Sequence, residues 1–80
     1  MNIVYILTSK KHPYRYYIGL TRDLERRIKE HNNGDSLYTK RYMSWKSQTY
    51  ITFKNKTRAE EFETYLKSGS GFSFLKRRLL

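Results

Sequence analysis

The sequence predicts a single α+β domain over residues 1–80, in which a three-stranded antiparallel sheet is flanked by helices. Three observations support this prediction. Segments with strand character and segments with helical periodicity follow one another in the order β, β, α, β, α, α. The length of 80 residues suits one modest core rather than two domains with a cleft between them. Aromatic residues make up 16% of the chain, which supplies the bulk that such a core needs.

Three segments have strand character. Ile3–Thr8 is a continuous apolar, β-branched and aromatic run, which is typical of a central strand covered on both faces. Tyr14–Leu20 is a second β-rich run, and the polar Ser9–Pro13 between the two predicts an antiparallel hairpin. Gly19 is expected to end or bulge this second strand. Trp45–Phe53, which alternates most clearly toward its end, is the third predicted strand.

A first helix is predicted over Leu24–Asn32. Asp23 is its candidate N-cap, and Gly34 stands in the usual position of a glycine that ends a helix. The segment that follows, Asp35–Ser44, is polar and aromatic without a clear period, so we expect a loop there.

Two further helices complete the prediction. Thr57 and Glu60 have the spacing of a capping box, which predicts a helix over Arg58–Lys67. Ser68–Gly71 is expected to be a flexible break, and Phe72–Leu80 a short basic and apolar helix that packs against the sheet.

The charge of the chain points to a polyanionic partner. Lys and Arg number 17 against 7 Asp and Glu, giving a formal charge of +10, and the acids fall in two windows, 23–35 and 60–63. A solubilising surface is the plainer explanation, and nucleic acid is the functional one. A membrane-surface role is not expected, because the predicted helices use their apolar faces for the core.

Other classes of protein are excluded by composition. The chain has no cysteine, so neither disulfides nor thiolate ligands can hold the fold. The longest apolar run, Ile3–Leu7, is too short to span a bilayer. We therefore expect a soluble cytoplasmic protein with no membrane contact.

A few polar side chains are predicted to point toward the core. At about 100° per residue, Arg27 and His31 border the apolar stripe of the first helix, and Glu63 borders that of the second long helix. Arg26, Lys29 and Glu30 should project to the far side. Glu63 is then the one inward carboxylate, and an ion pair with Arg27 would explain it as well as a catalytic role would.

These residues limit the chemistry of a phosphodiester hydrolase. A single inward carboxylate cannot support a two-metal site, but one Mg²⁺, or Mn²⁺ in its place, could be held by Glu63 and substrate oxygens with Arg27 in support. His12 and His31 are too few for a zinc site. Tyr5 and Tyr17 could lie together across the hairpin, where an aromatic pair is an ordinary stabiliser. Basic residues elsewhere are candidate phosphate contacts: Lys40, Arg41, Lys46, Lys76, Arg77 and Arg78.

Taken in order, several of these segments match a known family. The sequence resembles the GIY-YIG nuclease superfamily, and in particular its small stand-alone bacterial proteins. The resemblance covers nearly the whole chain and rests on an ordered set of motifs: Val4-Tyr5-Ile6, Tyr17-Ile18-Gly19, Leu20-Thr21, Asp23-Leu24, Arg26-Arg27, His31-Asn32-Asn33-Gly34, Trp45-Lys46, Phe62-Glu63, Leu66-Lys67 and Gly69-Ser70-Gly71.

The resemblance implies a metal-dependent endonuclease site on the surface of the three-stranded sheet. Tyr5 and Tyr17 would be the two motif tyrosines that act as or beside the general base. Arg27 would stabilise the phosphate charge, and His31 would accept a proton or orient the nucleophile. Glu63 would bind the single divalent metal. Arg27 and Glu63 are also the pair that helical geometry selects, and for the two tyrosines the catalytic interpretation now outweighs the ordinary aromatic pair.

Three functions are compatible with this interpretation. The first is an endonuclease acting on DNA, with structured or branched DNA in repair or recombination as a candidate substrate and RNA as an alternative. The second is a basic module that binds nucleic acid without cutting it and is targeted by a partner protein. The third, a structural basic subunit of a complex, leaves the inward polar residues unexplained. The chain departs from its family at Val4, Ser44 and Phe72, where glycine, proline and a basic residue are common.

Overall fold

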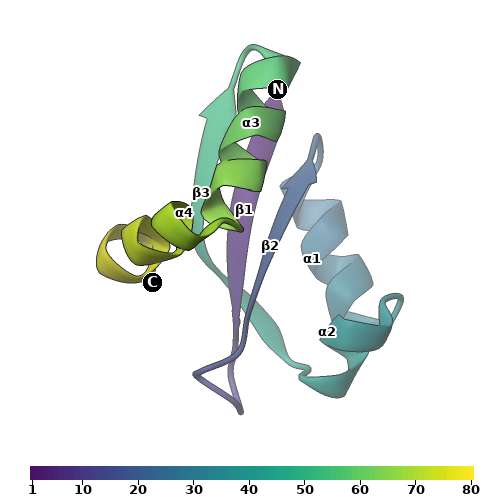
Figure 1. Ribbon diagram of the computed structural model, residues 1–80. Helices are drawn as coiled ribbons and strands as arrows, with labels where there is room; N and C mark the ends of the chain where they lie inside the picture. Colours follow the sequence, from purple (N-terminus) through teal and green to yellow (C-terminus); the bar gives the residue numbers. More distant parts are fainter.

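The computed structural model describes residues 1–80 and contains one sheet and five helical segments (Figure 1). The strands and helices follow one another along the chain as β1 (Asn2–Ser9), β2 (Tyr16–Thr21), α1 (Leu24–Asn32), α2 (Leu37–Arg41), β3 (Trp45–Phe53), α3 (Lys56–Leu66), α4 (Gly69–Phe74) and η1 (Leu75–Leu79), the last a single π-helical turn. This order confirms the predicted α+β class.

The sheet is antiparallel and has the strand order β2-β1-β3. The central position predicted for the first strand is therefore confirmed. Strand β2 begins at Tyr16, two residues later than predicted, because the preceding residues belong to the turn. The expectation for Gly19 was wrong: it neither ends nor bulges β2, but pairs with Tyr5 in a regular register.

The two faces of β1 are both covered, as its continuous apolar run predicted. Val4 and Ile6 pack with buried residues of α3 and η1, including Ala59 and Leu75. The intervening Tyr5 and Leu7 pack on the opposite face with Trp45 and with partly buried residues of α1. Figure 1 shows the same layering: α3 and α4 lie in front of the sheet, and the fainter α1 and α2 lie farther back.

Helix α2 was missed by the sequence prediction, which placed a loop there. Its five residues are too few to show a helical period, and the helix is held by tertiary contacts rather than by propensity. Thr39 is fully buried, and its backbone carbonyl accepts a hydrogen bond from the indole Nε1 of Trp45 at 2.7 Å. This contact fixes α2 against the sheet.

The helix starts also differ from prediction. The N-cap of α3 is Asn55, whose Oδ1 accepts from the backbone N–H of Arg58 at 3.0 Å, so the capping box at Thr57 was wrong. Ser68 caps α4 in the same way, by accepting from the backbone N–H of Gly71, so the predicted flexible break is an ordered helix start. The side-chain cap at Asp23 is confirmed.

The C-terminal segment is helical, as predicted. Leu75 is fully buried in the core and Leu79 packs against it, whereas Phe72 stays 43% exposed. No helix of the structure has the length and apolar character needed to cross a bilayer.

Candidate active site

Four of the residues predicted to be catalytic meet on one face of the sheet. Tyr5 comes from the middle of β1, Tyr17 from β2, and Arg27 and His31 from successive turns of α1. The ring centroids of Tyr5 and Tyr17 are 6.2 Å apart, and the ring of Tyr17 lies 4.7 Å from that of His31. Arg27 and His31 lie at the border between α1 and the core, and Tyr5 and Tyr17 lie near each other across the hairpin, both as predicted.

The phenol of Tyr5 is the centre of this cluster. Its oxygen lies 3.0 Å from Nε2 of His31, and Nε of Arg27 donates to it at 3.4 Å. Tyr5 is fully buried and His31 is 1% exposed, whereas a third of the Arg27 side chain reaches solvent. The cluster therefore has a buried imidazole and hydroxyl beside a cation that is partly exposed to solvent.

The hydrogen bonds assign the tautomer of His31. Nδ1 of the imidazole lies 2.9 Å from Oγ1 of Thr39, and that hydroxyl in turn donates to the backbone carbonyl of Ser36 at 3.4 Å. Because a carbonyl can only accept, the Thr39 oxygen is free to accept from His31, and Nδ1 carries the proton. Nε2 is then an acceptor, and the hydroxyl of Tyr5 donates to it.

The electrostatics agree with this assignment. Burial lowers the pKa of His31 below its ordinary value, and the positive charge of Arg27 lowers it further, so the imidazole is neutral at pH 7. Burial also raises the pKa of Tyr5, while the hydrogen bond and charge of Arg27 oppose that rise. The resting site thus contains a neutral phenol that donates to a neutral imidazole.

Gly19 is a site residue that the sequence reasoning missed. The ring of Tyr5 lies across β2 at this position, and a Cβ on Gly19 would stand 2.2 Å from the Tyr5 hydroxyl oxygen. Only glycine leaves the space that lets this ring reach α1. The cross-strand pairing of the two residues could have revealed this in advance, had the register been known.

The ion pair considered between Glu63 and Arg27 does not form. Nη1 of Arg27 instead contacts Oε1 of Glu30 at 2.8 Å, within α1, so the expectation that Glu30 projects away was wrong. This hydrogen bond raises the pKa of Arg27 and lowers that of Glu30. Oε2 of Glu63 lies 3.3 Å from Nζ of Lys67, one turn later in α3.

Glu63 is linked to the tyrosine cluster only through its charge. Its side chain is 23% exposed, at the boundary of the apolar face as predicted, and its negative charge contributes to the raised pKa of Tyr5. No three His, Asp or Glu side chains come together, so the protein alone does not form a closed metal cage. The carboxylate of Glu63 has the oxygen ligands that a hard divalent cation prefers, and such an ion would take its other ligands from water and substrate.

Residues outside the predicted set hold the cluster in place. Asn32 brackets the start of β3: its Oδ1 accepts from the backbone N–H of Trp45 at 2.7 Å, and its Nδ2 donates to the carbonyl of the same residue at 3.1 Å. Because Asn32 directly follows His31, this clamp fixes the end of α1 relative to the sheet. Thr39 adds the second support through α2.

The predicted phosphate contacts do not form one patch. Lys40 and Arg41 lie in α2, directly after the site residue Thr39, whereas Lys76, Arg77 and Arg78 lie in η1, which packs on the opposite face of the sheet. Lys46 is exposed on β3. Their roles remain predictions, and only the α2 pair lies on the same face of the sheet as the tyrosine cluster.

Four side chains thus form one cluster: the tyrosine of β1, the tyrosine of β2 that stands two residues before Gly19, and the arginine and histidine of α1. The model of the GIY-YIG catalytic domain matches residues 1–76 of the chain. The chain belongs to the GIY-YIG family. The family is a nuclease superfamily, and its members generally depend on divalent metal ions.

Individual relatives agree with this membership. The GIY-YIG chain is 43% identical over 68 residues to UPF0213 protein CPE1444 from Clostridium perfringens, a match that covers 84% of this chain and 71% of the relative. It is also similar to the solution NMR structure of UPF0213 protein BH0048 from Bacillus halodurans, with a TM-score of 0.54 and 33% identity. That match covers 94% of this chain and 82% of the other. These relatives are small stand-alone GIY-YIG proteins, as the sequence predicted.

Proposed function

We propose that this chain is an endonuclease that hydrolyses phosphodiester bonds of DNA with the help of one divalent cation, Mg²⁺ or Mn²⁺. The observation that supports it best is the hydrogen-bonded group of Tyr5, His31 and Arg27, whose central hydroxyl also lies in the field of the Glu63 carboxylate. A proton acceptor, a cation and a carboxylate are the groups that hydrolysis of a phosphodiester requires.

The proposed proton path runs along these hydrogen bonds and requires that the Arg27 side chain move aside, so that water reaches the buried hydroxyl of Tyr5. A water molecule that attacks phosphorus must lose a proton, and the oxygen of Tyr5 can take it while its own proton moves to Nε2 of His31. The imidazole becomes a cation, with its Nδ1 proton held by Thr39. The neutral resting state of His31 is what makes it available as the acceptor.

The remaining charges act on the phosphate. The exposed third of Arg27 can donate to phosphate oxygens, and its pairing with Glu30 holds the guanidinium in position from behind. Glu63 would hold the divalent cation, which would supply Lewis-acid stabilisation of the phosphate and the leaving oxygen. Lys67 must then leave Glu63, and its ammonium becomes free for the substrate.

Cleavage assays on a panel of structured DNAs test the proposal. Purified protein should cut at least one substrate with Mg²⁺ or Mn²⁺ and none with EDTA. Arg27→Ala should slow cleavage by about 10²–10³-fold, as loss of a group that stabilises transition-state charge does. Glu63→Gln should abolish it, whereas Glu61→Gln, on an exposed carboxylate of the same helix, should leave it unchanged.

One observation favours the second candidate, a module that binds nucleic acid without cutting it. Both groups that would face the phosphate already have partners within their own helices, Lys67 for Glu63 and Glu30 for Arg27. If these pairs persist when nucleic acid binds, the assay should show salt-sensitive binding and no cleavage of any DNA or RNA with either metal. Metal-dependent turnover that Glu63→Gln removes would reject this candidate.

The choice of substrate is the finer part of the proposal. Structured or branched DNA in repair or recombination is the expected class, with RNA as the alternative and a partner protein as a means of targeting. The same panel should therefore include forked, flapped and single-stranded DNA and a matched RNA. A preference that appears only in cell extract would indicate the partner.

A further inference from the structure

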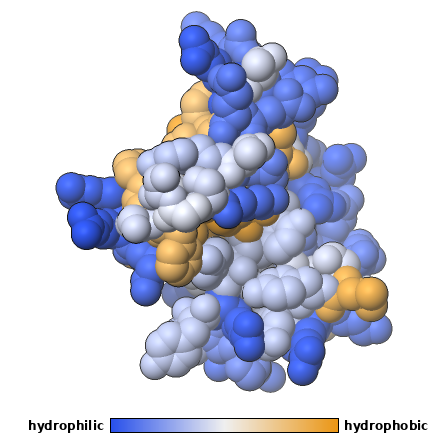
Figure 2. All heavy atoms as spheres, viewed as in Figure 1, coloured by the Kyte–Doolittle hydropathy of each residue, from blue (hydrophilic) through white to orange (hydrophobic).

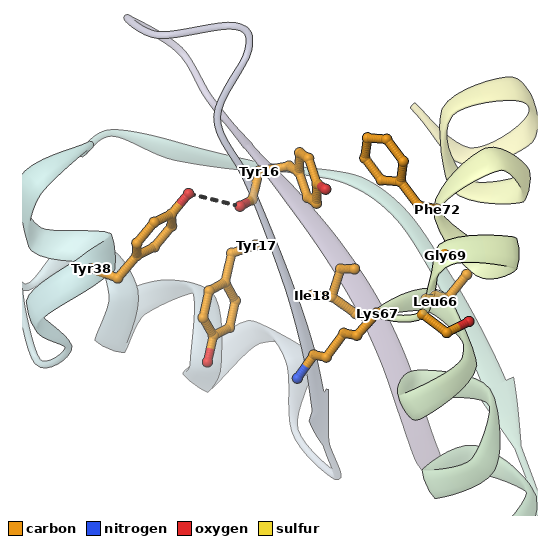
Figure 3. A pocket seen from close by; sticks show the side chains of 9 residues that line it. Tyr16, Tyr17, Ile18, Tyr38, Leu66, Lys67, Gly69 and Phe72 are labelled. Carbon is orange, nitrogen blue, oxygen red and sulfur yellow. Dashed lines mark hydrogen bonds between the residues drawn. The ribbon is translucent and has the colours of Figure 1, made fainter.

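A groove of about 510 Å³ lies beside the tyrosine cluster, over the outer edge of β2 (Figure 3). Figure 3 shows Tyr38 of α2 on one side of it and Phe72 of α4 on the other, with the ring of Tyr16 between them and Tyr17 and Lys67 below. In the same region of Figure 2, a pale zone of intermediate hydropathy lies among strongly hydrophilic residues. The groove is therefore lined largely by aromatic and apolar residues, with Lys67 as its one charged residue.

The walls of the groove present aromatic rings to solvent. Tyr38 is 40% exposed and Phe72 is 43% exposed, although aromatic side chains of this size are more often buried. Tyr38 is held in place, because its hydroxyl donates to the backbone carbonyl of Tyr16 at 3.2 Å and its ring lies 6.2 Å from that of Tyr17. Exposed aromatic rings are the surfaces on which unstacked nucleobases bind, and the ring of Phe72 also has the ammonium of Lys76 at 5.4 Å from its centroid.

The groove is continuous with the catalytic cluster. Tyr17 lines it and also contacts His31, so a ligand in the groove would touch the site directly. Lys67 lines it as well and pairs with Glu63, the proposed metal ligand. An ammonium at this place suits the phosphate that joins a bound base to the next nucleotide.

We propose that this groove is a subsite for one unpaired nucleotide next to the scissile phosphate, with its base against the aromatic rings on the Phe72 side of the groove and its phosphate on Lys67. The inference rests on the proposed function and names its substrate class: nucleic acid with an unpaired base at the cleavage position. A fully paired duplex would have to fray or expel a base to enter, at a cost in affinity.

A peptide strand is the other chemistry that an exposed sheet edge can accept, because β2 has only one neighbour in the sheet. The formal charge of +10 and the ammonium in the groove favour the polyanion. Binding measurements with oligonucleotides distinguish nucleic acid from a peptide as the occupant of the groove.

Binding is measured without cleavage, in EDTA, by fluorescence anisotropy of labelled oligonucleotides. A 12-nucleotide oligothymidylate should bind more tightly than a duplex of equal length. Phe72→Leu, which keeps an apolar side chain but removes the ring, should weaken binding of the single strand about five-fold or more and leave binding of the duplex nearly unchanged. Lys67→Gln should weaken both, with a smaller dependence on salt.

Phe74→Leu is the matched control. Phe74 lies two residues later in the same helix and is 38% exposed, but it packs on Phe62 and Tyr65 rather than lining the groove. It should leave oligonucleotide binding unchanged, and circular dichroism should show both variants folded. In NMR spectra, thymidine 5′-monophosphate should shift the amides of Gly69 and Phe72 but not that of Phe74.

Several results would overturn the inference: equal effects of Phe72→Leu and Phe74→Leu, tighter binding of the duplex, or no shift at Gly69 and Phe72, as expected if the groove takes a peptide. These results are separable from failure of the proposed function. A protein that binds single strands through Phe72 but cuts nothing keeps the subsite and loses the nuclease. A protein that cuts DNA but binds and cuts single strands equally well with and without the Phe72→Leu change keeps the nuclease and loses the subsite.

Discussion

The Tyr5 side chain belongs both to the hydrophobic core and to the proposed site. Its ring belongs to the buried cluster with Leu7 and Trp45, while its hydroxyl meets His31 and Arg27. Because the ring is packed on all sides, the hydroxyl has little freedom to move away from the imidazole. The precision of the proposed site therefore comes from core packing rather than from loops.

Gly19→Ala tests this packing. The added methyl would overlap the Tyr5 hydroxyl, so the ring must move away from α1. We expect a loss of about 1–3 kcal/mol in the free energy of unfolding, measured by urea titration, and loss of any cleavage activity. Gly69→Ala is the stability control, because a Cβ there meets no atom within 4 Å. Equal stability of the two variants would contradict the placement of the Tyr5 ring.

Thr39→Val tests the assigned tautomer of His31. Valine has the shape of threonine but cannot accept from Nδ1, so the imidazole should lose its preference for the Nδ1–H form. Two-dimensional ¹⁵N NMR of the histidine ring should show this directly, and cleavage should slow by about tenfold or more. Thr39→Ser keeps the hydroxyl and should restore both. Unchanged ring nitrogen shifts in Thr39→Val would reject the assignment.

His31 should also make stability depend on pH. Burial lowers the pKa of this group in the folded protein, so the unfolded chain binds a proton first as the pH falls through about 6.5. Stability from this group is present above that pH and is lost toward the lower folded pKa. Urea unfolding at pH 7.5 and 5.5 should show the decrease.

The matching variants isolate this contribution to the pH dependence. His31→Gln should flatten the difference between the two pH values, because the buried titrating group is gone. His12→Gln, on an exposed histidine of the β1–β2 turn, should leave the difference in place. A wild-type protein that is equally stable at both pH values would contradict the expectation.

Among the secondary-structure elements, the long ones followed the sequence and the short ones did not. The bounds of α1 and β3 match the predicted ranges, since each has a clear period and a clear start. Helix α2 has five residues and no period of its own, yet it carries Thr39 to the imidazole. Its position depends on the indole of Trp45, which belongs to the sheet and adds nothing to the local pattern of α2.

The start of α3 offers a direct test at this scale. Asn55→Ala should cost about 1 kcal/mol in the free energy of unfolding, because it removes the side-chain acceptor of the first helical turn. Thr57→Ala should cost little, since Thr57 lies inside the helix and is exposed. Thermal or urea unfolding measures both. The reverse order would restore the capping box that the sequence suggested.

At the scale of the whole molecule, the positive charge is spread over both faces of the sheet. The α2 pair lies on the face of the tyrosine cluster, and the basic residues of η1 lie on the other. One bound helix of nucleic acid cannot touch all of them equally. The excess charge therefore attracts nucleic acid generally, and only part of it should position the substrate.

Salt dependence separates these two contributions. The double variant Lys40→Gln, Arg41→Gln should weaken binding and lower the slope of log affinity against log salt by about 0.7–0.9 for each phosphate that the protein no longer neutralises. The triple variant of Lys76, Arg77 and Arg78 to Gln removes more charge but should lower the slope less. Titrations at several salt concentrations measure both. A larger change for the triple variant would place the nucleic acid over η1.

The sequence alone determined the α+β class, the central strand, both long helices and the family, and it predicts Tyr5, Tyr17, Arg27, His31 and Glu63 as site residues. These follow from periodicity, composition and ordered motifs, which are local properties of the chain. The tertiary structure decided which of those groups touch. Arg27 pairs with Glu30 and Glu63 pairs with Lys67. Gly19 leaves room for the ring of Tyr5, and the hydroxyl of Thr39 contacts the imidazole of His31. Such pairings depend on strand register and on packing between separate segments, which no local pattern encodes.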